Sequence, residues 1–265
     1  MPHVILKRVW DYCTYNEYFF AFIFVLLFIS SLIQNYVRAN GSSTDWFLLR
    51  ILVFIIVSGY GMSITKSRIN QGVRLPKILI KDIFLMGIKS SIIFCIYVFV
   101  QGVILSCVCY SLNFPVFDLE EMLLHWSDTI NMLFYHDPLN TVLFVIFGSI
   151  IFYITSFFTE IALAILADTD SLLAALDLPL IKRSIDVVGW RHYAKDFTMI
   201  ILAIVILSHL VSFDIPFTFL DSIIDMILSF MIFATQYLGI GAVYCDIKDL
   251  ESETSWSFFI YFLDI

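Results

Sequence analysis

The stretch SGYGMSITKSRINQGVRLPKI, residues 58–78, is the most informative part of the sequence, because an apolar segment ends in it and a cluster of positive charge begins. The residues before it are apolar over about the length that a helix needs to cross a bilayer. Lys66, Arg68, Arg74 and Lys77 then follow within twelve residues. Because loops rich in Lys and Arg stay in the cytoplasm, the stretch predicts a membrane-spanning helix that ends at a cytoplasmic loop.

The composition of the whole chain agrees with a membrane protein. Of its 265 residues, 60% are hydrophobic and 14% are charged, whereas soluble domains are about 45–50% apolar and about 25% charged. The mean hydropathy of +0.92 excludes an ordinary soluble domain, whose surface must be largely polar. The net charge of −8 and the lack of a basic stripe interleaved with aromatics argue against a nucleic-acid partner. The five cysteines fit neither a disulfide framework nor a zinc site, and no cofactor is expected.

Six apolar segments are long enough to cross the membrane as helices, since about 20 apolar residues span the hydrocarbon core. They cover residues of about 18–37, 46–64, 84–110, 139–167, 197–213 and 217–244. No small-residue cleavage site follows the first, which is therefore expected to be a retained span rather than a signal peptide. The sequence predicts an all-α polytopic integral membrane protein, organised as a single membrane domain over residues 1–265.

The charges orient these spans. Of the 15 Lys and Arg, all but Arg38 and Arg50 fall on one side of the six-span arrangement. The loop at residues 111–138, on the opposite side, has no Lys or Arg and several carboxylates. We therefore expect a protein of the cell membrane with both termini in the cytoplasm.

Two cytoplasmic loops share a pattern that predicts amphipathic helices at the membrane interface. Residues 75–89 read LPKILIKDIFLMGIK, and residues 178–191 read LPLIKRSIDVVGWR. Each begins with Leu-Pro, which suits the first turn of a helix, and each reaches a glycine near the start of the next span. We expect interfacial helices at about 75–86 and 178–188, each followed by a glycine bend, and Asp177 is placed to cap the second. The two loops would then be a parallel repeat.

The basic residues of these loops are candidates to contact the headgroups of anionic lipids. They are Lys66, Arg68, Arg74, Lys77, Lys81, Lys182 and Arg183.

Several short motifs in this order resemble an uncharacterised family of archaeal multi-pass membrane proteins, the domain of unknown function numbered four thousand and thirteen. The matching residues are Gly59-Tyr60, Leu75-Pro76, Gly189-Trp190 and the segment from Gly239 to Tyr244. The resemblance covers roughly residues 20–250 and implies a membrane fold, but no catalytic residues. Members usually carry an Arg near the last motif, where this chain has Gln236 and Tyr237.

Glu160 is the most conspicuous polar residue, because it lies near the end of the predicted span at 139–167. An ionisable group at membrane depth indicates a function, a partner or a water-filled cavity. The alternatives are an ion pair with a basic residue such as Lys89 and helix packing through Thr155, Ser156 and Thr159. Other polar candidates within the predicted spans are Gln101, Gln236, Asp225 and Asp221. The two aspartates are four residues apart and so share a helix face, where they could bind a cation, but a solvated outer end of the sixth helix is the favoured interpretation.

Two further groups of residues are candidates for a site. The predicted outer loop contains His125, Asp128, His136 and Asp137, which are ligands that zinc accepts, although a water-facing loop explains them as well. Two pairs of glycines near the ends of the second and sixth spans are expected to let these helices pack closely, with a hinge as the alternative. The pairs are Gly59 with Gly61 and Gly239 with Gly241.

Three classes of function follow from these features. A non-enzymatic membrane component or accessory subunit is favoured, since no catalytic motif is present and the basic loops suit lipid contact. Its partners would be membrane lipids, another membrane subunit or a second copy of the chain. A small transporter or channel that uses Glu160 is the alternative, and a lipid-modifying enzyme with its site in the outer loop is the third.

Overall fold

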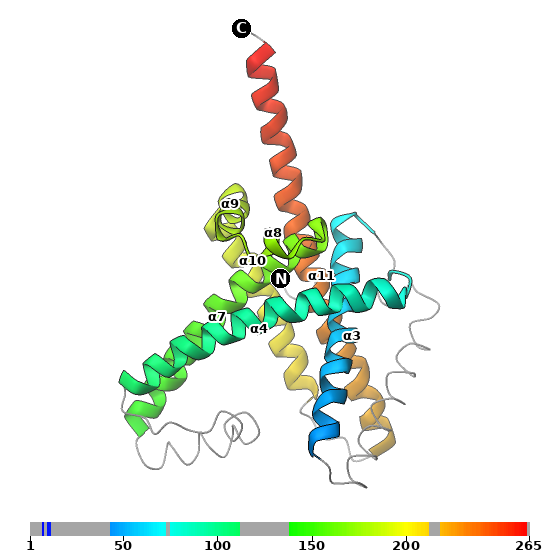
Figure 1. Cartoon of the computed structure of the whole chain (residues 1–265), viewed down its shortest axis with the longest axis vertical. Coiled ribbons are helices and arrows are strands. Elements are labelled where there is room, and N and C mark those ends of the chain that lie inside the picture. Colours follow the sequence, from blue (N-terminus) through cyan, green and yellow to red (C-terminus); the bar gives the residue numbers. More distant parts are fainter. Residues whose placement is uncertain are drawn as a thin grey trace. The chain divides into compact units, whose positions relative to one another are not determined.

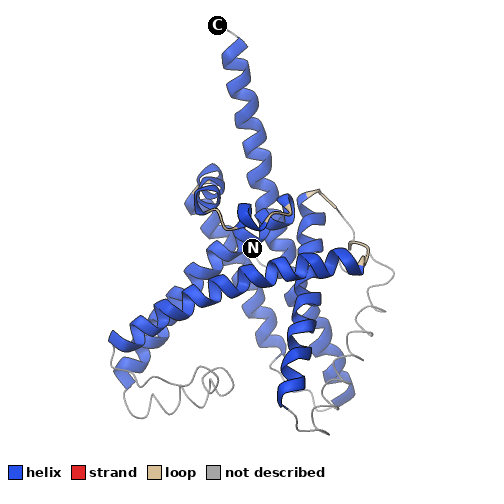
Figure 2. Ribbon diagram, in the orientation of Figure 1, coloured by secondary structure: helices blue, strands red, loops and turns tan. Residues whose placement is uncertain are grey.

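The computed structural model describes residues 7, 10, 11, 43–72, 75–111, 138–211 and 218–263. In these ranges the chain forms α-helices and no strands (Figure 2). The helices are α3 (Ser43–Ile69), α4 (Ile80–Ser111), α7 (Pro138–Thr169), α8 (Leu172–Ala175), α9 (Leu178–Val188), α10 (Trp190–Val211) and α11 (Thr218–Leu263). The all-helical class predicted from the sequence is confirmed for the part of the chain that is described.

Four of the described helices are long and apolar enough to cross a membrane. These segments are Ile80–Ser111, Pro138–Thr169, Trp190–Leu210 and Ile227–Lys248. They contain most of the spans predicted at 84–110, 139–167, 197–213 and 217–244. The span predicted at 46–64 lies within α3, which is helical but is not among the four, and the span predicted at 18–37 lies outside the described residues. Large apolar side chains point outward from these helices, such as Phe99 on α4 and Phe152 on α7, as lipid-facing helices require.

The described residues fall into two compact units, divided after Ser91 and after Glu160. The smaller unit, Ile92–Glu160, contains the later part of α4 and the first part of α7. Within it, Gly148 on α7 lies beside the Leu105 side chain of α4. The larger unit contains all the other described helices.

In the larger unit, α11 packs against α3 and α10, and α9 packs against α10 and α11 (Figure 1). Helices α3 and α11 run in the same direction, and α10 runs in the opposite direction. One end of this three-helix bundle therefore holds the last residue of α3, the first residue of α10, and α9. We call it the α9 end.

Helix α9 begins and ends at the residues that the sequence predicted, 178 and 188. Pro179 lies in its first turn, and Gly189 ends it with a φ of 89°, which glycine adopts without steric cost. Asp177 holds the capping position, but its side chain makes no capping hydrogen bond. Helix α10 starts directly after the glycine, so a bend does separate α9 from the span that follows.

The apolar face of α9 is covered by protein, which differs from the expectation of a helix that lies in lipid. Ile181 and Ile185 are completely buried, and Ser184 between them is buried as well. Leu178 remains 63% exposed at the start of the helix. The sequence pattern could not separate the two cases, because an apolar stripe is equally suited to a bilayer surface and to a protein core.

The first of the two similar loops differs from its prediction more strongly. Residues 75–79 are not helical, and α4 runs without a break from Ile80 through Gly87. The separate interfacial helix expected at 75–86 is therefore absent, and so is the bend at Gly87. The physical reason is that Gly87 is needed for close packing: a Cβ atom there would overlap the backbone carbonyl of Ile55 on α3. The two loops thus resemble each other in sequence and not in structure.

Helix α11 continues far beyond its candidate span. It has 46 residues, which corresponds to a length of about 69 Å at 1.5 Å per residue. The aromatic C-terminal segment, which is too short to span by itself, forms the last turns of this helix up to Leu263.

Candidate functional site

The end of α7 carries several polar side chains of the larger unit, and the local sequence explains its shape. Helix α7 stops at Thr169, and Asp170 follows with a φ of 57°. This left-handed conformation is one that Asp tolerates better than most residues, and here it lets the Asp170 amide donate to the Leu166 carbonyl at 2.8 Å. The Ser171 hydroxyl then accepts a hydrogen bond from the Ala174 amide at 3.4 Å and caps the short helix α8.

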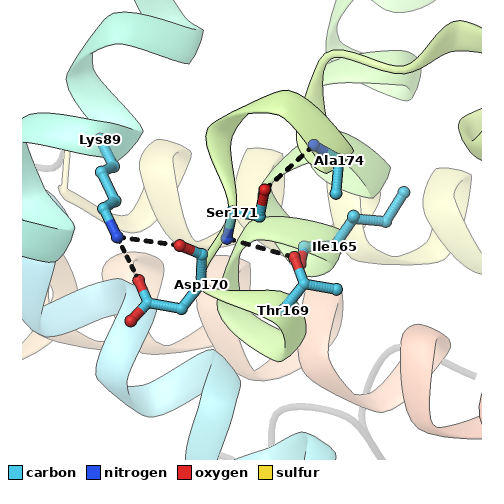
Figure 3. Close-up of polar contacts among 6 residues, drawn as sticks. All are labelled: Lys89, Ile165, Thr169, Asp170, Ser171 and Ala174. Carbon is cyan, nitrogen blue, oxygen red and sulfur yellow. Dashed lines mark hydrogen bonds and ion pairs between the residues drawn. The ribbon is translucent and has the colours of Figure 1, made fainter.

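Two lysines from other helices bind this end of α7. Lys89 on α4 donates to the backbone carbonyl of Asp170 at 2.8 Å and to its Oδ1 at 2.6 Å (Figure 3). Lys248 on α11 donates to Oδ1 of Asp168 at 2.7 Å. Positive charge at the C-terminal end of a helix also interacts favourably with the helix dipole. Both pairs are partly exposed, so each stabilises the unit by about 1 kcal/mol or less.

Lys89 is thereby placed with Asp170, whereas the sequence offered it as an ion-pair partner for Glu160. Glu160 lies one residue before the boundary of the larger unit and is only 7% exposed. The neighbouring hydroxyls bond to their own helix, with Thr159 donating to the Thr155 carbonyl at 2.7 Å and Thr155 to the Ile151 carbonyl at 2.8 Å. These two threonines therefore do not donate hydrogen bonds to a second helix.

The four candidate glycines lie at helix contacts in the larger unit. A Cβ on Gly61 would overlap the Tyr237 ring of α11, and one on Gly241 would lie 2.8 Å from the Arg68 Cβ of α3. One glycine of each pair thus faces the contact between α3 and α11. The other two face different helices, because Gly59 lies against the α4 backbone at Ile83 and Gly239 lies against the Ile200 side chain of α10.

Hydrogen bonds between helices accompany two of these close contacts. The Thr65 hydroxyl of α3 donates to the Tyr237 carbonyl of α11 at 3.0 Å. The Ser90 hydroxyl of α4 donates to the Ser58 hydroxyl of α3 at 3.1 Å, and both serines are buried. Small residues that bring backbones together and hydroxyls that bond across them are typical of helix contacts in membranes.

The candidate lipid-contact residues are mostly exposed. Lys66, Lys77, Lys81, Lys182 and Arg183 are exposed, and Arg68 is half-buried beside Gly241. Lys66 and Arg68 lie in the last turn of α3, and Lys182 and Arg183 lie on α9, so these four belong to the α9 end.

Some candidates are not placed by the structure. Arg74, His125, Asp128, His136 and Asp137 lie outside the described residues. Asp221 and Asp225 lie on α11, and their side chains are not described. Gln101 on α4 and Gln236 on α11 are half-buried. In the described ranges, no three side chains of His, Cys, Asp or Glu gather closely enough to hold a metal ion.

Sequence reasoning missed the residues that join the ends of the helices. Asp168 and Asp170 were not among the candidates, although the Asp-Thr-Asp-Ser sequence that contains them is a typical loop signal. Ser90, which faces α3, was also missed, and Gly87 was interpreted as a bend and not as a site of close packing. Their role becomes visible only when the helix that they face is known.

The comparisons with known proteins place the chain in a family without assigning an activity. The family model described as protein of unknown function DUF4013 matches residues 46–215. This is more than half of the chain and somewhat less than the range of 20–250 that the short motifs suggested. No match was found among the curated proteins or among the solved structures. The chain belongs to the DUF4013 family.

Proposed function

We propose that this protein is a six-span component of the cell membrane that performs no reaction of its own and binds anionic lipid at its cytoplasmic side. In this proposal both termini are cytoplasmic. Five of the six spans are formed by helices α3, α4, α7, α10 and α11, and the remaining one is the span predicted at 18–37. The alternating directions of α3, α10 and α11 support it, since they are the directions that the second, fifth and sixth spans would have.

The observation that carries the proposal is the position of the positive side chains. Lys66 and Arg68 at the end of α3 and Lys182 and Arg183 on α9 come from distant parts of the sequence and belong to the same end of the bundle. Basic residues at one end of a membrane bundle favour the cytoplasmic side. They also attract anionic headgroups by about 1 kcal/mol for each well-placed charge.

Lipid retention tests this proposal. We expect native mass spectrometry of the purified full-length protein to show bound phosphatidylglycerol, and we expect the double variant Lys66→Gln, Lys182→Gln to retain several-fold less. Lys248→Gln is the matched control, because Lys248 is already paired with Asp168. Equal retention by the wild type, the double variant and the control would refute lipid binding at this end.

Transport is a second candidate function, and the burial of Glu160 favours it. A carboxyl group that is 7% exposed on a membrane helix is costly to keep unless it serves a purpose. The pairing of Lys89 with Asp170 takes away the counter-ion that the sequence suggested for Glu160.

A proton-flux assay tests the second candidate. Proteoliposomes that contain the wild type should dissipate an imposed pH gradient faster than empty vesicles, and Glu160→Gln should abolish the difference, because an amide cannot carry a proton. Thr159→Val is the control, since this hydroxyl bonds only its own helix in the contacts described above. A variant Glu160→Gln that is as fast as the wild type would exclude a proton pathway through this carboxyl.

A further inference from the structure

The segment between α3 and α4 presents a group of exposed apolar side chains. Ile78, Leu79 and Ile80 are consecutive and are 55%, 58% and 79% exposed. Lys77 and Lys81 flank them and are exposed as well. We call residues 77–81 the entry segment, because α4 begins within it.

Contacts on both sides hold the entry segment in place. Leu75 before it is buried, and the adjacent Pro76 carbonyl accepts a hydrogen bond from the Tyr60 hydroxyl of α3 at 3.5 Å. After it, Ile83 is buried against α3, where its carbonyl faces Gly59. The three apolar side chains between these anchors are therefore kept on the surface by the fold.

The neighbouring surface indicates which environment suits them. The exposed apolar side chains continue along α4 to Phe84 and Leu85, and the same helix is a candidate membrane span. Helix α4 has 32 residues, about 48 Å, so it is longer than the hydrocarbon core of about 30 Å and one of its ends extends toward the headgroups. A short apolar group with lysines on both sides, placed at such an end, fits the boundary between acyl chains and phosphates.

We propose that the entry segment anchors the protein in the anionic leaflet, with Ile78, Leu79 and Ile80 among the upper acyl chains and with Lys77 and Lys81 on the lipid phosphates. Asp82 follows in the first turn of α4 and is exposed, so the lysines exceed the local negative charge by one. This inference rests on the proposed lipid-binding function. It assigns the insertion of apolar side chains between acyl chains to the entry segment and not to α9, whose apolar side chains Ile181 and Ile185 are buried in protein.

Depth measurement in bilayers tests the anchor. A spin label would be attached to Leu79→Cys in the full-length protein after its native cysteines have been replaced, and the protein would be placed in nanodiscs. We expect the spin label at position 79 to be more accessible to oxygen than to a water-soluble nickel complex. We expect the reverse for a label at the exposed control position Asn70→Cys. Ile78→Cys is the second labelling site in case the first variant does not fold.

The role of the lysines is tested with the same labelled protein. Nanodiscs that contain phosphatidylglycerol should place the label deeper than nanodiscs of phosphatidylcholine, and Lys77→Gln with Lys81→Gln should abolish the difference. The anchor would be overturned if the label at position 79 were as accessible to the nickel complex as the label at position 70. It would also be overturned if the depth of the label at position 79 were the same in both kinds of nanodisc. These results are independent of lipid retention at Lys66 and Lys182, so the anchor and the proposed function can fail separately.

Discussion

Ile185→Ala is expected to lower the free energy of unfolding by about 2–5 kcal/mol, as for other fully buried isoleucines. Ile185 is on α9, where its side chain is completely enclosed by protein. Chemical unfolding of the purified protein in detergent micelles would measure the loss.

Leu178→Ala provides the matched control on the same helix, because Leu178 is largely exposed. We expect it to change the free energy of unfolding by less than about 0.5 kcal/mol, as is usual for surface substitutions. If α9 instead lay on the bilayer, the two side chains would be equivalent. Equal costs for Ile185→Ala and Leu178→Ala would therefore contradict the packing of α9 on protein.

Gly59→Ala is expected to destabilise the larger unit by about 1–3 kcal/mol or more, the usual range for overpacking. The added methyl group would overlap the Ile83 carbonyl and would lie 2.8 Å from the Gly87 amide nitrogen. Both atoms belong to the backbone of α4, so no side chain can rotate away and the two helices must separate. The yield of monodisperse protein and its unfolding midpoint would report the effect.

Gly102→Ala makes the same substitution where space is available, since apart from the adjoining residues and backbone of α4 itself no atom lies within 4 Å of the added methyl group. It should raise stability by up to about 1 kcal/mol, because alanine favours a helix more than glycine does. Opposite signs for the two variants are the expected result. If both variants unfold like the wild type, the close contact between α3 and α4 does not exist.

The sequence predicted those features that depend on local chemistry. The bounds of α9 follow from Pro179 in its first turn and Gly189 at its end, and both act through their own backbones. The membrane character of α4, α7, α10 and α11 follows from their length and apolar composition, which a single sequence shows directly.

Features that depend on a distant partner could not be predicted. The spacing of apolar residues in α9 did not reveal whether lipid or protein covers Ile181 and Ile185. The glycine at 87 suggested a bend because glycine permits one, but glycine also permits close approach, and the position of Ile55 decides between them. The pairing of Lys89 with Asp170 joins residues 81 positions apart, and the local sequence gives no signal for it.

The most direct test of the account is the accessibility of single cysteines in intact cells, in a protein whose native cysteines have been replaced. Asn70→Cys reports the loop after α3, and Ser127→Cys reports the acidic loop predicted on the outer side. A membrane-impermeant maleimide should label position 127 at once and position 70 only after the cells are made permeable. Immediate labelling at 70 with protection at 127, or equal labelling at both positions, would contradict a membrane protein whose basic end faces the cytoplasm.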